Sequence, residues 1–220
     1  MVTINPMGQS SPMTLQRQFG VSPHRGFSLI ELLVVMVIIG IVAALSLPAV
    51  SSVSRGFNIT SGGQMVVDQI GLARQTALAK NRNAEVRFYK KKGVSGSDVN
   101  VIGMQVWSQA SRNGAIVYEP ASRVSWLPTG VKILESDTYS PLIGTKFSSE
   151  RGFLDLPAGA ESYVAVRFRA TGNPEAALNF ETNFITLVSE QEQGGTRPLN
   201  YFTVQIDPLT GRTAIYRPDA

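Results

Sequence analysis

The chain has 220 residues, a formal net charge of +4 and no cysteine. The absence of cysteine excludes disulfides and a Cys–His catalytic pair, and the length leaves about one ordinary domain beyond the N-terminal segments. Residues 1–83 contain six basic and two acidic side chains, whereas residues 84–220 contain fourteen of each. Residues 84–220 therefore have no net charge that would attract a polyanion such as nucleic acid. Binding of a polyanion there would require a local basic patch.

The first 25 residues are polar and include Pro6, Pro12 and Pro23. This composition is typical of a disordered, removable leader, so we exclude residues 1–26 from the fold. Met7 and Met13 are alternative starts, which leaves the length of the leader open.

An apolar run follows the leader. From Leu32 to Leu47 every residue is apolar or small apart from Ser46. A helix from Phe27 to Leu47 would rise ~30 Å, about the thickness of a bilayer core. We therefore predict a transmembrane helix over residues 27–48. The basic residues before it place the N-terminus in the cytoplasm and the C-terminal domain outside the membrane.

Glu31 is the one carboxylate in this run. An ionised side chain inside hydrocarbon is costly, so such a residue needs a partner and is a functional candidate. Because Glu31 lies near the start of the span, its side chain could instead reach the cytoplasmic interface. The residues alone leave both interpretations open.

Two other interpretations of the apolar run compete with a filament-forming helix. The run could be a secretory signal cleaved near residues 44–46, although such signals are usually shorter and lack an acid. It could also be an uncleaved signal anchor. Neither interpretation gives Glu31 a role.

The sequence GFSLIELL at residues 26–33 resembles the class III signal of type IV pilins and type II secretion pseudopilins. The resemblance implies that a prepilin peptidase cleaves between Gly26 and Phe27 and that Phe27 is N-methylated. It also implies that Glu31, the fifth residue of the mature chain, pairs with the new α-amino group of a neighbouring subunit. Pro48 lies where many pilins carry a proline that loosens the helix.

Residues 49–83 are predicted to form a second helical segment. Pro48 favours a kink or break near Leu47, and the serines and glycines that follow favour a flexible joint. Ser61-x-x-Gln64 has the form of a capping box, which predicts a new helix start. Apolar residues then recur at helical spacing up to about Asn81, and this stripe is expected to lie on a sheet.

The period changes to two after Asn83, which predicts a β-rich domain over residues 84–220. Lys90–Gly93 are expected at a charged hairpin tip, and the turn Asp207–Gly211 is expected to close a C-terminal hairpin. The fold class is α+β, with a long N-terminal helix before a mainly antiparallel sheet. Strands are predicted at residues 84–89, 101–107, 115–119, 131–134, 163–169, 184–188, 201–206 and 213–217.

This order of elements is similar to the GspH/FimT group of minor pilins and pseudopilins. The resemblance is carried by the segment Leu72–Gln75 and by a C-terminal hairpin with a Gly-Arg pair. Residues 73–90 and 204–218 also resemble a pilin-like family, the Verru_Chthon cassette protein D. The outer domains of pilins vary greatly, so no partner surface is carried over from either group.

No catalytic or ligand-binding pattern is apparent. The single histidine, His24, lies in the leader, which excludes a Ser-His-Asp site and a multi-His zinc site in the mature chain. The sequence has neither a phosphate-binding loop nor a calcium loop. Trp107 and Trp126 are expected in the core or at its rim. We expect no enzymatic activity, no metal and no cofactor.

Two classes of function follow from these observations. The first is a structural subunit of a pilus or secretion pseudopilus, with the prepilin peptidase, other pilin subunits and inner-membrane lipid as partners. The second is a minor pilin that captures DNA, with contacts from Arg212, Arg217 and Lys90, Lys91 and Lys92. A simple membrane-anchored periplasmic domain is a further alternative. The expected location is the inner membrane and then an envelope filament.

Overall fold

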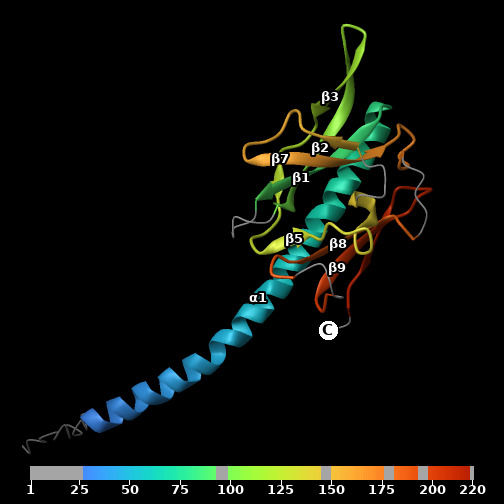
Figure 1. Cartoon of the computed structure of the whole chain (residues 1–220). Helices are drawn as coiled ribbons and strands as arrows, with labels where there is room; N and C mark the ends of the chain where they lie inside the picture. The colour runs from blue at the N-terminus through green and yellow to red at the C-terminus, as the bar shows by residue number, and fades with distance from the viewer. Residues whose placement is uncertain (1–26, 93–98, 145–149, 176–180, 193–197, 219–220) are drawn as a thin grey trace, which may run out of the picture. The chain divides into compact units, whose positions relative to one another are not determined.

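The structure is a computed structural model that describes residues 27–92, 99–144, 150–175, 181–192 and 198–218 (Figure 1). The chain divides into two compact units, Met1–Ser46 and Leu47–Ala220. The leader and Gly26 lie outside the described residues.

A single helix, α1, runs from Leu29 to Lys80 over 52 residues. The break expected near Leu47 and the separate helix start expected at Ser61 are therefore wrong. A proline removes one backbone hydrogen bond from a helix, and a helix of this length retains the bonds on either side of that position. A kink at Pro48 and a flexible joint after it stay predictions.

Gly62 and Gly63 lower the helix propensity of α1, but they lie where the helix packs against the sheet. A Cβ atom on Gly62 would lie 3.2 Å from Val131 Cγ1, and a Cβ on Gly63 would overlap the ring of Phe202. At these two glycines the helix backbone lies close to side chains of the sheet. Burial of the adjoining side chains offsets the conformational cost of glycine in a helix.

The strands form one sheet in which every described pairing is antiparallel, which confirms the α+β prediction. The main path through the sheet is β10-β9-β8-β5-β2-β1-β7-β6, and β3 and β4 also pair with β2. The short 3-10 helix η1 spans Pro141–Ile143. The strands are β1 (Ala84–Lys92), β2 (Val99–Arg112), β3 (Ala115–Pro120), β4 (Ser125–Trp126), β5 (Val131–Ile133), β6 (Glu150–Gly152), β7 (Ala160–Phe168), β8 (Phe184–Ser189), β9 (Tyr201–Ile206) and β10 (Thr213–Tyr216).

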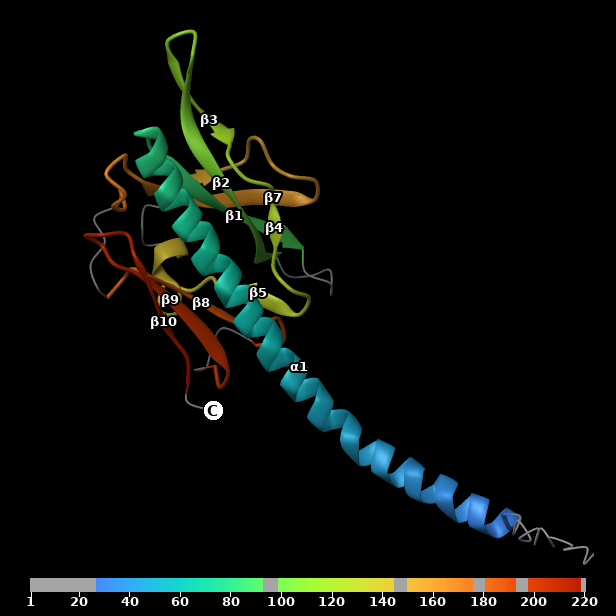
Figure 2. The ribbon, with the colours of Figure 1, turned by 180° about the vertical axis from the view of Figure 1, so that it is seen from behind.

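The second half of α1 supplies one side of the hydrophobic core. The predicted apolar stripe is confirmed, since Val66, Ile70, Ala73 and Ala77 are all fully buried against the sheet. Figure 2 shows this part of the helix crossing the sheet, with β4 and β5 to one side and β9 and β10 to the other. Burial on this scale is what holds a helix with several glycines in place.

The C-terminal hairpin forms at the predicted turn. The carboxylate of Asp207 accepts hydrogen bonds from the backbone N–H groups of Leu209 and Thr210, both at 2.8 Å. These bonds favour the charged form and hold the pKa of Asp207 below its ordinary value. Gly211 has a φ of +68° and lies against the carbonyl of Gly172, so no larger residue fits there without strain.

The structure corrects two details of the strand prediction. Lys90–Lys92 are the last residues of β1 rather than a hairpin tip. The segment that follows them, residues 93–98, lies outside the described residues. The structure also contains two strands that were not predicted, β4 and β6. They have only two and three residues, too few to show a period of two.

Candidate functional site

The N-terminal end of α1 presents an apolar surface. All side chains from Phe27 to Ala44 are exposed, including Leu29 with 83% of its surface accessible. A patch of this size is unusual on a protein that works as a soluble monomer and marks an interaction surface. Among the described residues, no helical stretch is both long enough and apolar enough to count as a membrane span.

Glu31 lies in the first turn of α1. It is the only charged residue of the sequence between Phe27 and Ser54, so the surface around it is otherwise uncharged. Phe27 precedes the helix, and the first helical hydrogen bond described runs from the N–H of Leu32 to the carbonyl of Ser28 at 3.1 Å. A carboxylate in this first turn is favoured by the partial positive charge of the helix N-terminus.

The three lysines proposed as DNA contacts have partners within the chain. Lys90 forms an ion pair with Glu135, and Lys92 lies 3.8 Å from a carboxylate oxygen of Glu161. The Nζ of Lys91 lies 5.1 Å from the centre of the Trp126 ring. Their positive charges are therefore partly compensated before any ligand arrives.

The two proposed arginines belong to the other end of the sheet. Arg217 donates a hydrogen bond to Thr60 Oγ1 on α1, and its Cζ lies 5.8 Å from the centre of the Phe202 ring. Arg212 is exposed and immediately precedes β10. In Figure 2, β4, which carries the partner of Lys91, lies on the opposite side of α1 from β10. The structure does not bring the five basic residues into one patch.

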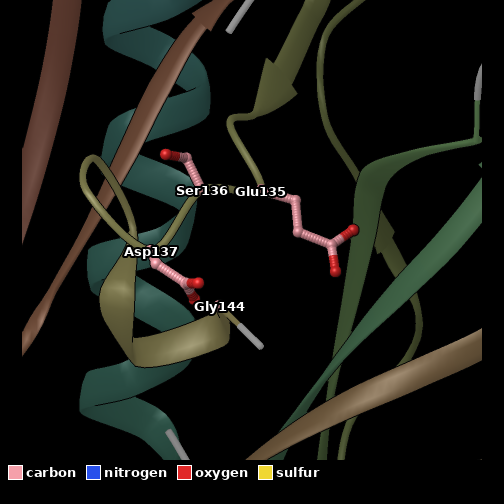
Figure 3. A pocket seen from close by; sticks show the side chains of 4 residues that line it. All are labelled: Glu135, Ser136, Asp137 and Gly144. Atoms are coloured by element: carbon pink, nitrogen blue, oxygen red, sulfur yellow. The ribbon is translucent and has the colours of Figure 1, made fainter. Parts of the chain in front are cut away.

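A shallow polar pocket lies beside η1 and is lined by Glu135, Ser136, Asp137 and Gly144 (Figure 3). Its two carboxylates diverge, because Glu135 points towards β1, where it pairs with Lys90. Within the described ranges, no group of three or more histidine, cysteine or acidic side chains is arranged to hold a metal ion. The pocket therefore lacks the convergent donors of a ligand site.

Comparison with known proteins agrees with the N-terminal resemblance. Residues 22–47 match the family model of the prokaryotic N-terminal methylation motif. No curated protein and no solved structure matches the chain. The chain thus carries a prepilin-type motif, and this motif includes Phe27, Glu31 and the exposed apolar turns that follow them.

Sequence reasoning missed a buried polar cluster on the face of the sheet that points away from α1. The cluster is centred on Glu85 and Arg87 of β1, which are 1% and 5% exposed. The alternation along β1 predicts a strand, but it does not show whether the side that carries Glu85 and Arg87 lies in water or is covered. Aromatic residues in the predicted neighbouring strands, Trp107 and Tyr163, were the sequence feature that could have indicated a covered charge, because aromatic rings can pack over a guanidinium.

Proposed function

We propose that this chain is a structural subunit of a type IV pilus-like or type II secretion filament. The observation that carries the proposal is the prepilin-type motif, which coincides with the exposed apolar part of α1. In this proposal a prepilin peptidase hydrolyses the Gly26–Phe27 bond, and the new N-terminus is methylated. The chain itself makes or breaks no covalent bond.

Assembly is proposed to proceed through the N-terminal helix. In the inner membrane, residues 27–48 contact lipid, with the C-terminal domain on the periplasmic side. In the filament, helices of neighbouring subunits replace that lipid. The Glu31 carboxylate then pairs with the α-amino group of Phe27 in the next subunit. An unpaired charge in a low-dielectric core is much more costly than a paired one, so this contact fixes the register between subunits.

The proposal depends first on processing. The decisive measurement is the intact mass and N-terminal sequence of the mature chain isolated from membranes, with the prepilin peptidase present or inactivated. We expect a chain that begins at Phe27 with one added methyl group when the peptidase is active. A mature chain that begins elsewhere, or that keeps its leader in the presence of the peptidase, contradicts the proposal.

DNA capture is the weaker alternative. Four of the five basic side chains considered for DNA already contact partners within the chain, and residues 84–220 have no net charge. Phosphate binding would have to displace those contacts. We therefore propose other copies of pilin-type subunits, rather than nucleic acid, as the partners of this chain.

A further inference from the structure

The central strand β1 is buried on both faces. Its Ala84, Val86 and Phe88 side chains pack towards α1, and its Glu85, Arg87 and Tyr89 side chains are buried on the far face. A strand between two neighbours normally presents a continuous apolar surface when both of its faces are covered. The buried charges on the far face therefore require an explanation.

The far-face charges are tightly partnered. Arg87 Nε donates to Glu85 Oε1 at 2.7 Å, and Arg167 Nη2 of β7 donates to Glu85 Oε2 at 3.0 Å. The Arg87 guanidinium lies between two aromatic rings, 3.8 Å from the centre of Trp107 on β2 and 4.3 Å from that of Tyr163 on β7. Side chains of three adjacent strands thus meet at one buried carboxylate and one buried guanidinium.

Two features of this arrangement count against a purely stabilising role. Buried ion pairs are often matched or exceeded in stability by apolar residues of similar volume. In addition, Arg87 Nη1 is buried and has no hydrogen-bond partner. A buried donor without a partner has a net cost, so the cluster contributes something other than maximal stability.

The pairing of β1 with β7 shows what that contribution is. On the side facing α1, the native pairs include Val86–Val166 and Phe88–Val164. A slip of two residues in one direction would keep an apolar pair, Phe88–Val166, but would place Lys90 opposite Val164. A slip in the other direction would keep Val86–Val164 but would place Phe88 opposite Ser162. The apolar face therefore opposes each of these slips through one mixed pair only, although a slip of one residue would exchange the two faces.

The far face adds a charge-based discrimination. In the native register Glu85 is opposite Arg167, and Arg87 is opposite Ala165. A two-residue slip in one direction would place Glu85 opposite Arg169 but would also place Arg87 opposite Arg167, where like charges repel. A slip in the other direction places Glu85 opposite Ala165, so the buried carboxylate loses the β7 arginine.

The register of β1 against β2 is fixed separately, by two hydrogen bonds outside the cluster. Asn83 exchanges hydrogen bonds with Gln109 at the point where β1 leaves α1: Gln109 N–H donates to Asn83 O at 2.8 Å, and Asn83 N–H donates to Gln109 Oε1 at 3.2 Å. Strand β7 lies far along the chain from β1 and is placed against it by the sheet itself. We propose that the Glu85–Arg87–Arg167 cluster is a register lock that selects the pairing of β7 with β1.

Disulfide trapping in the full-length chain tests the lock, because the protein has no native cysteine. Directly opposed residues in an antiparallel pair have Cα atoms about 4.5–5.5 Å apart, within disulfide range. Diagonal neighbours are about 7–8 Å apart, which is too far. The pair Val86→Cys with Val166→Cys reports the native register. The pairs Val86→Cys with Val164→Cys and Phe88→Cys with Val166→Cys report the two slips, one in each direction. All three reporters replace only apolar residues of the face towards α1.

Each reporter pair is combined with Glu85→Leu, Arg87→Met and Arg167→Met together, and separately with Arg167→Met alone. After oxidation in detergent, the cross-linked peptides are quantified by mass spectrometry. With the native cluster we expect the native disulfide without either slipped one. With the apolar triple variant we expect a slipped disulfide to appear and the native one to decrease.

The control is Arg112→Met, which removes an exposed ion pair with Glu119 and should leave only the native disulfide. If the triple variant gives the native disulfide alone, the proposal is overturned. If the triple variant does not fold, Arg167→Met decides. A slipped disulfide in that variant supports the lock, and the native disulfide alone overturns it.

Discussion

At the scale of single residues, Glu31 carries the proposed assembly contact. Glu31→Ala removes the carboxylate that would pair with the α-amino group of the neighbouring Phe27. We expect peptidase cleavage to be retained and incorporation into filaments to be lost. Immunoblots of sheared filaments and of membranes would measure both steps.

The matched control for this substitution is Asp68→Ala. Asp68 is an exposed carboxylate on the same helix, where its Oδ1 accepts a hydrogen bond from Gln64 at 2.9 Å. We expect normal incorporation of the Asp68 variant. Normal incorporation of Glu31→Ala would be evidence against the pairing, even if processing at Phe27 had been demonstrated.

Asp207 predicts a pH dependence of stability. Its folded-state pKa lies below the ordinary value of 3.8, chiefly because the Thr210 and Leu209 N–H groups donate to the charged carboxylate. The stabilisation is therefore fully present above the ordinary pKa and is lost as the pH falls from that value through the folded-state pKa. Thermal unfolding at neutral pH and at about pH 3 should show a smaller acid-induced decrease in Asp207→Ala than in the unchanged protein.

Asp68→Asn is the control for the acid series, since it replaces an exposed aspartate outside the hairpin turn. It should retain the acid-induced decrease that Asp207→Ala loses in part. An unchanged pH dependence in Asp207→Ala would show that the turn hydrogen bonds do not stabilise the fold through this carboxylate.

At the scale of elements, the contact between α1 and β9 makes a prediction for Gly63. Gly63→Ala adds a methyl group where the ring of Phe202 already lies. Overpacking of this kind costs about 1–3 kcal/mol, which exceeds the gain of up to about 1 kcal/mol in helix propensity. We expect a net decrease in the free energy of unfolding, measured by denaturant titration.

Gly71 offers the matched control. It lies in the same helix, and a Cβ atom there would meet nothing within 4 Å. Gly71→Ala should therefore raise the free energy of unfolding by up to about 1 kcal/mol. If both variants change stability in the same direction, the close approach of α1 to Phe202 is not what makes Gly63 necessary.

The same helix shows what the sequence could and could not predict. The apolar stripe Val66, Ile70, Ala73 and Ala77 was predictable because its spacing follows from helix geometry. The continuity of α1 was not, because proline and glycine weaken a helix locally. Gly63 is explained by the ring of Phe202, a residue remote in the sequence. Helix propensity depends only on nearby residues and therefore cannot indicate such a long-range contact.

At the scale of the whole molecule, the distribution of charge predicts the response to DNA. The three lysines at the end of β1 are compensated by Glu135, Glu161 and the Trp126 ring. In gel-shift titrations of the detergent-solubilised full chain at low salt, we expect no shift of duplex DNA. A shift that weakens steeply with added salt would instead establish phosphate contacts.

The fold class was predictable at this scale, but the buried polar cluster was not. Alternation in β1 shows which residues share a face, and it does not show whether that face is covered. The cover over Glu85 and Arg87 comes from β2 and β7, through Trp107 and Tyr163. The Phe27–Glu31 signal could be predicted from sequence because it is contiguous in the chain, whereas the cluster depends on strand pairing.

The unbroken course of α1 has a mechanical consequence. Its residues from Val66 to Ala77 are embedded in the hydrophobic core, and its first turn begins at Leu29. Tension exerted on that first turn would travel along a ladder of peptide hydrogen bonds directly into the packed core. A helix that is continuous in this way resists extension until its own hydrogen bonds break.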